Sequence, residues 1–448
     1  MFFSNDSNFY KQLLRLTIPI YFQQLLKISV DTINSLMIGS INQVRMSALS
    51  QANQVFFVFF TLVNGFSVGC SVLVSQYWGK KDYESISMII SHSIKIVAIF
   101  SLIFSGLVYT FPHLFMRIYS SDPTIIMFGS TYLRTISLMF VVCGISTVLF
   151  GASRGIEQVR IILVTNIVSY SINILLDYLF IFGKFGFPVL GIQGVAIGTV
   201  VARIIEFLFC AVFFLREPTI PFMLKDLTRT DKKLRNSLLK ISIPMVGHEL
   251  VWSLGTSSGS MITGQLGKSA VAGYNVSNVL YDILASLGNG FMMSAGVVLG
   301  MTLGKGESEE AKRQANSIMG LSLVMGFVMM ALSFIFKNSF LSLYKLDPDA
   351  VNYAKQFIDI TAIVWPASYI EMVTMVTVLR AGGDGRVGFY TDLVVMWMIC
   401  IPLAWLAAFR FNAQPWLVVA IIKSIIVLEA IVGVLRVYSY KWVRNLTN

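Results

Sequence analysis

The feature that most constrains this chain is a series of apolar runs, each long enough to cross a lipid bilayer. Runs of about 20 to 30 residues between polar breaks occur twelve times, near residues 14–38, 48–76, 87–111, 125–152, 159–183, 189–214, 238–264, 270–303, 315–336, 352–379, 387–410 and 414–436. With 56% hydrophobic and only 13% charged residues, the chain has too few charges to cover a soluble globule. The sequence therefore predicts an all-α integral membrane protein with twelve transmembrane helices.

The net charge of +11 reflects membrane topology rather than nucleic-acid binding. If both termini are cytoplasmic, twenty of the lysines and arginines near helix ends fall on the cytoplasmic side and eight on the other. This positive-inside bias supports an even number of helices. We expect a multi-pass protein of the cell membrane, with both termini in the cytoplasm, the lipid bilayer as its surroundings and no nucleic-acid partner.

An internal repeat divides the chain into two related halves. When the sequence is shifted along itself by 225 positions, residues 13–84 lie over 238–309 without a gap, and sixteen of 72 positions are identical. Six helices separate the copies, so both halves have the same orientation and are related by a pseudo-two-fold axis along the membrane normal. The predicted domains are a six-helix bundle over 1–214, a cytoplasmic linker over 215–237 and a second six-helix bundle over 238–448. This architecture suits alternating access.

Polar side chains in the first half predict an ion-coupling site. Gln24, Lys27 and Asp31 follow one face of the first helix, and a carboxylate at bilayer depth costs roughly 2.5 to 3.5 kcal/mol, which makes it a candidate functional group. Asn173 and Asp177 lie one turn apart in the fifth helix. If these helices meet, the two carboxylates suit a sodium ion or a shared proton. The alternative is that Lys27 simply neutralises the nearby acid.

The helices of the second half carry stripes of polar residues that we interpret as the lining of a substrate cavity. The candidates are Gln24 of the first half and Glu249, Ser253, Thr256, Asn275, Asn278, Asp282 and Glu371 of the second. In the repeat, Asp31 lies over Thr256 and Glu249 lies over Gln24. Each acid is therefore dispensable for folding at the equivalent place, which favours a functional role. Serine and threonine also favour close packing of helices.

Signatures of enzymes and of cofactors are missing from the sequence. There is no glycine-rich phosphate loop and no histidine cluster with metal-ligand spacing, and the four cysteines have no paired spacing. We therefore expect a protein that is not an enzyme, has no cofactor and takes its energy from an ion gradient. The coupling ion would be a proton or sodium.

These residues together resemble the multidrug and toxic compound extrusion (MATE) family over nearly the whole chain. The resemblance rests on the helix from Pro19 through Asp31 to Gly39, the Gly65 to Gly79-Lys80 run, Asn173 to Asp177, Gly194 to Thr199, the repeat, and Arg380 to Asp384. It implies a twelve-helix antiporter that exports organic, often cationic and aromatic, small molecules in exchange for inward protons or sodium ions. It places a cation site on Asp31, Asn173, Asp177 and Thr199, and a further acid on Glu249.

Two residues depart from the family pattern, and two other functions stay open. Lys27 lies one turn from Asp31 and favours proton over sodium coupling, because a positive charge there competes with a bound cation. Glu371 lies near, but not at, the place of a family aspartate. A flippase of lipid-linked or polyanionic substrates would have the same architecture with a basic cavity, and a non-transporting membrane protein would leave the acids without a purpose. We expect a monomer.

Overall fold

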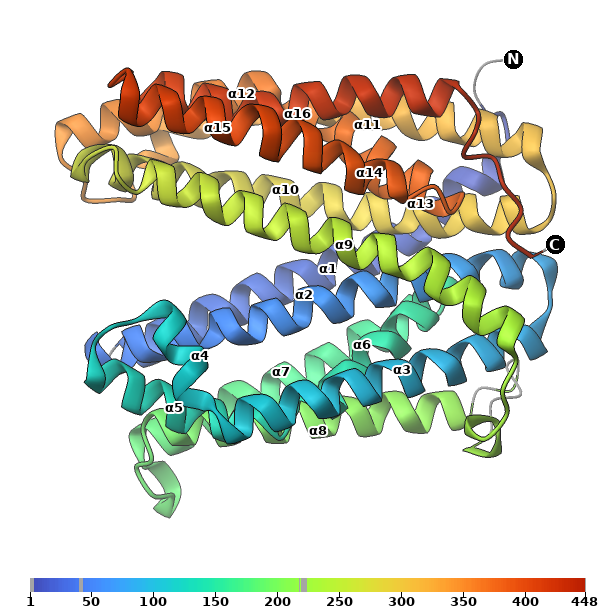
Figure 1. The fold of residues 1–448 in the computed structure, drawn as a ribbon, viewed down its shortest axis with the longest axis horizontal. Coiled ribbons are helices and arrows are strands. Elements are labelled where there is room, and N and C mark those ends of the chain that lie inside the picture. The colour runs from blue at the N-terminus through green and yellow to red at the C-terminus, as the bar shows by residue number, and fades with distance from the viewer. Residues whose placement is uncertain (1–3, 40–42, 217, 219–223, 448) are drawn as a thin grey trace. The chain divides into compact units, whose positions relative to one another are not determined.

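The computed structural model describes residues 4–39, 43–216, 218 and 224–447. Within the helices it does not describe ten side chains, among them those of Asp31, Asn34 and Ser35. The described part is built from helices and turns and contains no strand. This confirms the predicted all-α fold (Figure 1).

The chain divides into two compact units, one of which comprises residues Phe22–Val246. The helices of the first half of the chain are α1 (Ser7–Gly39), α2 (Gln43–Lys80), α3 (Tyr83–Thr110), α4 (Pro112–Tyr119), α5 (Pro123–Ser137), α6 (Phe140–Gly155), α7 (Val159–Phe182), η1 (Lys184–Gly186), α8 (Ile192–Arg216) and η2 (Leu224–Leu227). We call the Phe22–Val246 unit the N-unit. Its helices α2, α3, α5, α6, α7 and α8 pack on one another.

The other unit, which we call the C-unit, comprises Met1–Tyr21 and Gly247–Asn448. The helices of the second half of the chain are α9 (Lys232–Thr263), α10 (Lys268–Gly304), α11 (Ser308–Leu341), α12 (Pro348–Glu371), η3 (Met372–Val378), α13 (Leu379–Ala381), α14 (Arg386–Thr391), η4 (Asp392–Cys400), α15 (Ile401–Trp405), η5 (Leu406–Arg410) and α16 (Pro415–Tyr438). The segments η3, η4 and η5 are π-helical and continue the α-helices beside them.

The long helices account for the twelve predicted spans. In the described part of the chain, nine are long and apolar enough to cross a membrane, and α5 with α6, bent by 57°, pass the same test as a pair and make ten if the pair is one span. The remaining two are α1 and α9, the helices that carry polar stripes. Ser4 contacts α11 and Asn445, in the tail after α16, contacts the last residue of α10, so both lie at the same end of the C-unit helices (Figure 1).

The boundary between the units falls inside α1 and α9, at repeat-related positions. Tyr21 and Val246 are 225 residues apart, and each lies two residues after an in-helix proline, Pro19 or Pro244. The predicted domains ended instead at 214 and began again at 238. The compact units differ from the predicted domains because the first turns of α1 pack in the C-unit, whereas the first turns of α9 pack in the N-unit.

Glycines allow these helix starts to pack closely. A Cβ on Gly290 of α10 would lie 3.1 Å from the backbone nitrogen of Tyr21 in α1. A Cβ on Gly69 of α2 would collide with Ser242 of α9, 2.8 Å from its Cα. Both glycines are therefore sites of close helix packing.

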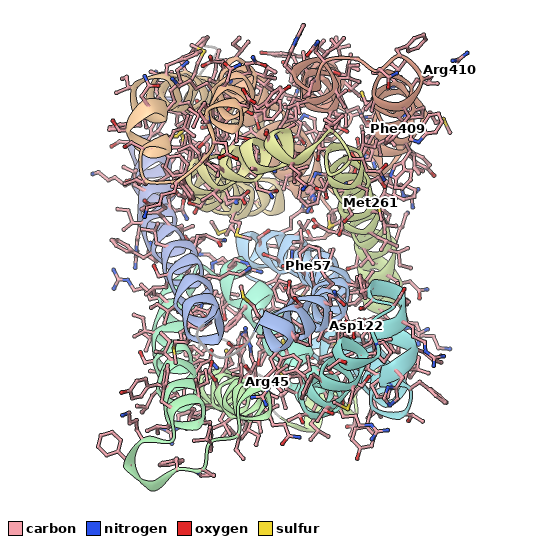
Figure 2. The ribbon with its side chains drawn as sticks, turned by 90° about the vertical axis from the view of Figure 1, so that its left-hand side faces the viewer. Arg45, Phe57, Asp122, Met261, Phe409 and Arg410 are labelled. Carbon is pink, nitrogen blue, oxygen red and sulfur yellow. The ribbon has the colours of Figure 1, made fainter. Side chains whose placement is uncertain are left out.

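Polar breaks in the sequence become capped turns that begin the next helix. Asp82 accepts a hydrogen bond from the backbone of Ser85 at 3.1 Å at the start of α3. Asp122, labelled in Figure 2, does the same for α5 at Thr124, with Pro123 in the first turn. These caps satisfy backbone donors that a helix start leaves unpaired.

Candidate functional site

Asp177 is the centre of a polar site in the N-unit. It lies on the inner face of α7 with 1% of its surface exposed, and Asn173, one turn earlier, is 7% exposed. Neither carboxylate oxygen has a hydrogen bond or an ionic partner of good geometry among the described residues, although Asn173 lies close enough to interact. A buried carboxylate in this setting needs a proton or a cation to balance its charge.

Helices α2, α5 and α8 complete this site. The Tyr132 hydroxyl of α5 donates to Oδ1 of Asn53 at 3.2 Å, and it also lies beside Thr199 and within electrostatic range of Asp177. Gly198 of α8 packs directly against Asp177, since a Cβ there would collide with Oδ1. The structure therefore brings together Asn173, Asp177 and Thr199, three of the four residues that the family resemblance places in the cation site. Tyr132 and Asn53 are additions that sequence analysis did not find.

The α1 residues of the proposed site are described only in part. Asp31 belongs to α1, but its side chain lies outside the described residues, so its distance from Asp177 stays a prediction. Lys27 is exposed in the N-unit, with its Nζ 5.6 Å from the centre of the Phe60 ring. Gln24 is half-buried.

A second polar site lies in the C-unit around Arg380. Its guanidinium donates from Nη1 to Oε1 of Glu249 at 2.9 Å, and the two side chains are 4% and 20% exposed. Arg380 is one of the twenty basic residues that the charge distribution assigns to the cytoplasmic side, and the structure buries it at the end of the α12 to α13 span. Glu249, predicted to face a substrate, therefore has an internal counter-charge.

Four further titratable groups lie near this ion pair: His248, Glu371, Asp392 and Glu429. His248 of α9 and Asp392 of η4 are joined by a hydrogen bond of 2.6 Å between Nδ1 and Oδ2. Glu429 of α16 is 4% exposed and interacts with the Asp392 carboxyl, while its Oε1 has no hydrogen bond among the described residues. Glu371 lies within electrostatic range of both Asp392 and Arg380.

The other proposed cavity residues are spread along α9 and α10. Asp282 is exposed in its unit and lies within electrostatic range of Lys423, whose Nζ is 4.3 Å from the centre of the Tyr281 ring. Tyr281 in turn stacks on Trp365 with ring centres 4.8 Å apart. Along the same two helices, Asn275 and Thr256 are exposed, Asn278 is half-buried and Ser253 is buried. Tyr281 also lies within electrostatic range of Glu371, so it connects the residues around Asp282 with the acids around Arg380.

Neither site has the donor set of a tightly held transition metal. Among the described residues, no group of three histidine, cysteine or acidic side chains could hold a metal ion. Oxygen donors do meet at Asp177, Asn173 and Thr199, and such ligands suit a hard cation such as sodium.

Comparisons with known proteins agree with this architecture, which defines a multi-pass membrane protein of two related halves with buried carboxylates. The chain belongs to the MATE family of transporters, because the MatE family model matches residues 19–179 and 244–406. The two matches begin 225 positions apart, the same distance as the sequence repeat.

Similarity to individual proteins extends along most of the chain. The probable multidrug resistance protein NorM of Agrobacterium fabrum is 25% identical over 409 residues, covering 89% of this chain and 87% of the relative. The uncharacterized transporter YisQ of Bacillus subtilis is 22% identical over 394 residues, covering 88% and 86%. The Vibrio cholerae MATE transporter VcmN has the same fold, with a TM-score of 0.87 at 18% identity over 97% of both chains.

Proposed function

We propose that this protein is an antiporter that exports organic, cationic or aromatic compounds in exchange for inward protons or sodium ions. The observation that carries the proposal is the Asp177 carboxylate, which is 1% exposed and has no ionic partner among the described residues. Such a group gains most from an ion that arrives and leaves during transport. The name of the NorM relative, a multidrug resistance protein, supports the same kind of substrate.

The ion site that we propose consists of Asp177, Asn173 and Thr199, joined by Asp31 from α1. Thr199 donates to the carbonyl of Val195 at 2.9 Å, which leaves lone pairs of its hydroxyl oxygen for a cation. Either a sodium ion among these oxygens or a proton on a carboxylate would neutralise the site. Lys27, on the same helix as Asp31, favours the proton.

The side chains that we propose for substrate binding are Gln24 in the N-unit and, in the C-unit, Glu249, Ser253, Thr256, Asn275, Asn278, Asp282 and Glu371. These side chains are acidic or neutral, which favours cations over polyanions and argues against a flippase of lipid-linked anions. We also propose that the protein works as a monomer in the cell membrane, with both termini in the cytoplasm.

Transport by the purified protein in lipid vesicles tests the proposed function. A sodium gradient or a pH gradient is imposed separately while movement of ethidium, a fluorescent organic cation, is followed. One gradient should drive ethidium, and Asp177→Asn should abolish the driven movement without unfolding the protein. If neither gradient drives ethidium or any other organic cation in the wild type, the proposal is wrong.

A matched control for Asp177→Asn is available in the same unit. Asp122 is an exposed aspartate whose role is to cap α5, and asparagine caps a helix as well as aspartate does. Asp122→Asn makes the same chemical change and should transport at the wild-type rate. Equal loss of transport in both variants would show that Asp177 has no special part in coupling.

A further inference from the structure

Arg380 uses only part of its hydrogen-bonding capacity in the contact with Glu249. A guanidinium has five N–H donors, and it stays charged at any pH that the protein meets. Nη1 donates to Glu249 at 2.9 Å, but the buried Nε has no partner among the described residues. Arg380 can therefore accept a second carboxylate without first losing the one it has.

Such a second carboxylate is available within the same unit. Glu371 precedes Arg380 by nine residues, at the point where α12 becomes the π-helical η3, and lies within electrostatic range of it. Glu371 also lies close to Asp392, which is already bonded to His248. Two neighbouring carboxylates favour the approach of a positive charge, so Glu371 is a natural alternative partner for Arg380.

The backbone around Arg380 is held firmly, which leaves its side chain as the part that can move. The loop after it is fixed by Asp384, which accepts from Nε of Arg436 at 2.8 Å and pairs with Arg444 at 3.5 Å. Gly382 packs against the backbone of Trp442, whose side chain is fully buried. The C-terminal tail therefore holds the loop in place.

We propose that Arg380 is a built-in competitor for cations at Glu249. Its guanidinium neutralises Glu249 while the site is empty, and it moves to Glu371 when a positive group of the substrate binds Glu249. A buried arginine without a counter-charge is strongly unfavourable, so Glu371 is required for the exchange. The inference rests on the proposed function for its substrate class, and it makes Arg380 a residue that determines specificity, because a neutral compound cannot replace it.

Equilibrium binding to the purified protein tests the competition. The probes are tetraphenylphosphonium, an aromatic cation, and triphenylphosphine oxide, a neutral aromatic compound. Arg380→Met should bind the cation about tenfold more tightly than wild type, because a fixed competing charge is gone, and should bind the neutral compound with unchanged affinity. Unchanged affinity for the cation, or an equal gain for both probes, overturns the inference.

A buried pair in the N-unit provides the matched control. Arg203 and Glu206 are joined at 2.6 Å, with Glu206 2% exposed, and neither is near Glu249 in the chain. Like Arg380→Met, Arg203→Met replaces an arginine that pairs with a glutamate inside the membrane. It should leave the affinity for tetraphenylphosphonium within about twofold of wild type. A tenfold gain in this variant as well would overturn the assignment to Arg380.

Carboxyl labelling tests the exchange of partners directly. Dicyclohexylcarbodiimide modifies accessible carboxyl groups in membranes, and peptide mass spectrometry resolves Glu249 from Glu371. Without ligand, Glu249 should react slowly in wild type and about tenfold faster in Arg380→Met, since an ion pair shields a carboxylate. Adding tetraphenylphosphonium should protect Glu371 in wild type but not in Arg380→Met. The inference is overturned if Glu249 is labelled equally in both proteins. It is also overturned if tetraphenylphosphonium does not change the labelling rate of Glu371 in wild type.

Arg380→Lys is a second test variant, which keeps the positive charge that Arg380→Met removes. The proposed exchange passes through a state in which the guanidinium contacts Glu371 before it leaves Glu249, and the compact ammonium of lysine cannot contact both carboxylates in this way. Arg380→Lys should still shield Glu249 without ligand, yet it should lose the protection of Glu371. Vesicles in which neither gradient drives any organic cation contradict the proposed function, whereas transport with unshielded Glu249 contradicts only the inference.

Discussion

At the scale of single residues, the contact between Gly198 and Asp177 shows how closely the N-unit site is built. Asp177 can occupy its place only because α8 has no side chain at position 198. A methyl group there would push the carboxylate away from Asn173 and Thr199. A shift of about 1 Å in such a site is enough to lower a rate about a hundredfold.

We therefore expect Gly198→Ala to lose most ion-driven transport while the protein still folds. Overpacking of this kind costs about 1 to 3 kcal/mol of stability. Transport in vesicles and thermal unfolding in detergent give the two readouts. Gly106→Ala is the control, because no atom lies within 4 Å of the added Cβ and alanine is the better helix former. Normal coupling in Gly198→Ala would mean that Asp177 has room to move.

The hydrogen bond between His248 and Asp392 leads to a second prediction at this scale. Replacing His248 by phenylalanine leaves a buried aspartate without this partner, and we expect a loss of about 2 to 4 kcal/mol. Asp392→Asn keeps an oxygen that can accept from Nδ1, so it should cost less. Thermal unfolding of both variants shows which is the less stable. The prediction is contradicted if Asp392→Asn is less stable than His248→Phe.

At the scale of helices and turns, the π-helical segments of the C-unit decide where its acids point. Glu371 directly precedes η3, and Asp392 is the first residue of η4. A π-helical turn holds more residues than an α-helical one and often occurs at a functional site. The extra residue rotates the part of the helix after η3 about the helix axis, so the direction of Arg380 relative to Glu371 depends on η3.

We predict that deleting one residue of η3, such as Met375, restores a regular helix and rotates Arg380 by about 100° relative to Glu371. The ion pair with Glu249 would break, and transport should be lost. Deleting Phe185, which is 90% exposed in the turn after α7, tests the effect of a deletion away from both sites. Retained transport after deletion of Met375 would show that this register does not matter.

These elements also mark the limit of sequence analysis. The apolar runs, the repeat and the turns are local patterns, so twelve helices and the proximity of Asn173 to Asp177 could be predicted. The burial of Arg380 could not be predicted, because a charge at the end of an apolar run is usually a loop residue. The pairing of Arg380 with Glu249 joins helices 131 positions apart in sequence, and no local pattern reports such a contact or a π-helical turn.

At the scale of the whole molecule, an even number of spans places both chain ends on one side of the membrane. Ser4 contacts the start of α11, and Asn445 donates to the carbonyl of Gly304 at 3.4 Å. In the C-unit these contacts lie at the end opposite Arg410, which faces the viewer in Figure 2. The charge distribution predicts that the end with Ser4 is cytoplasmic.

Cysteine labelling in intact cells can test this orientation. All four native cysteines are buried and free, which keeps the background low. Ser121→Cys, in the exposed turn before α5, should react with a membrane-impermeant maleimide added from outside. Ser439→Cys, in the exposed tail, should react only after the membrane is made permeable. The reverse order would place both termini outside, and inward ion flow would then have to enter each unit from the opposite end of the helices that carry Asp177 and Glu249.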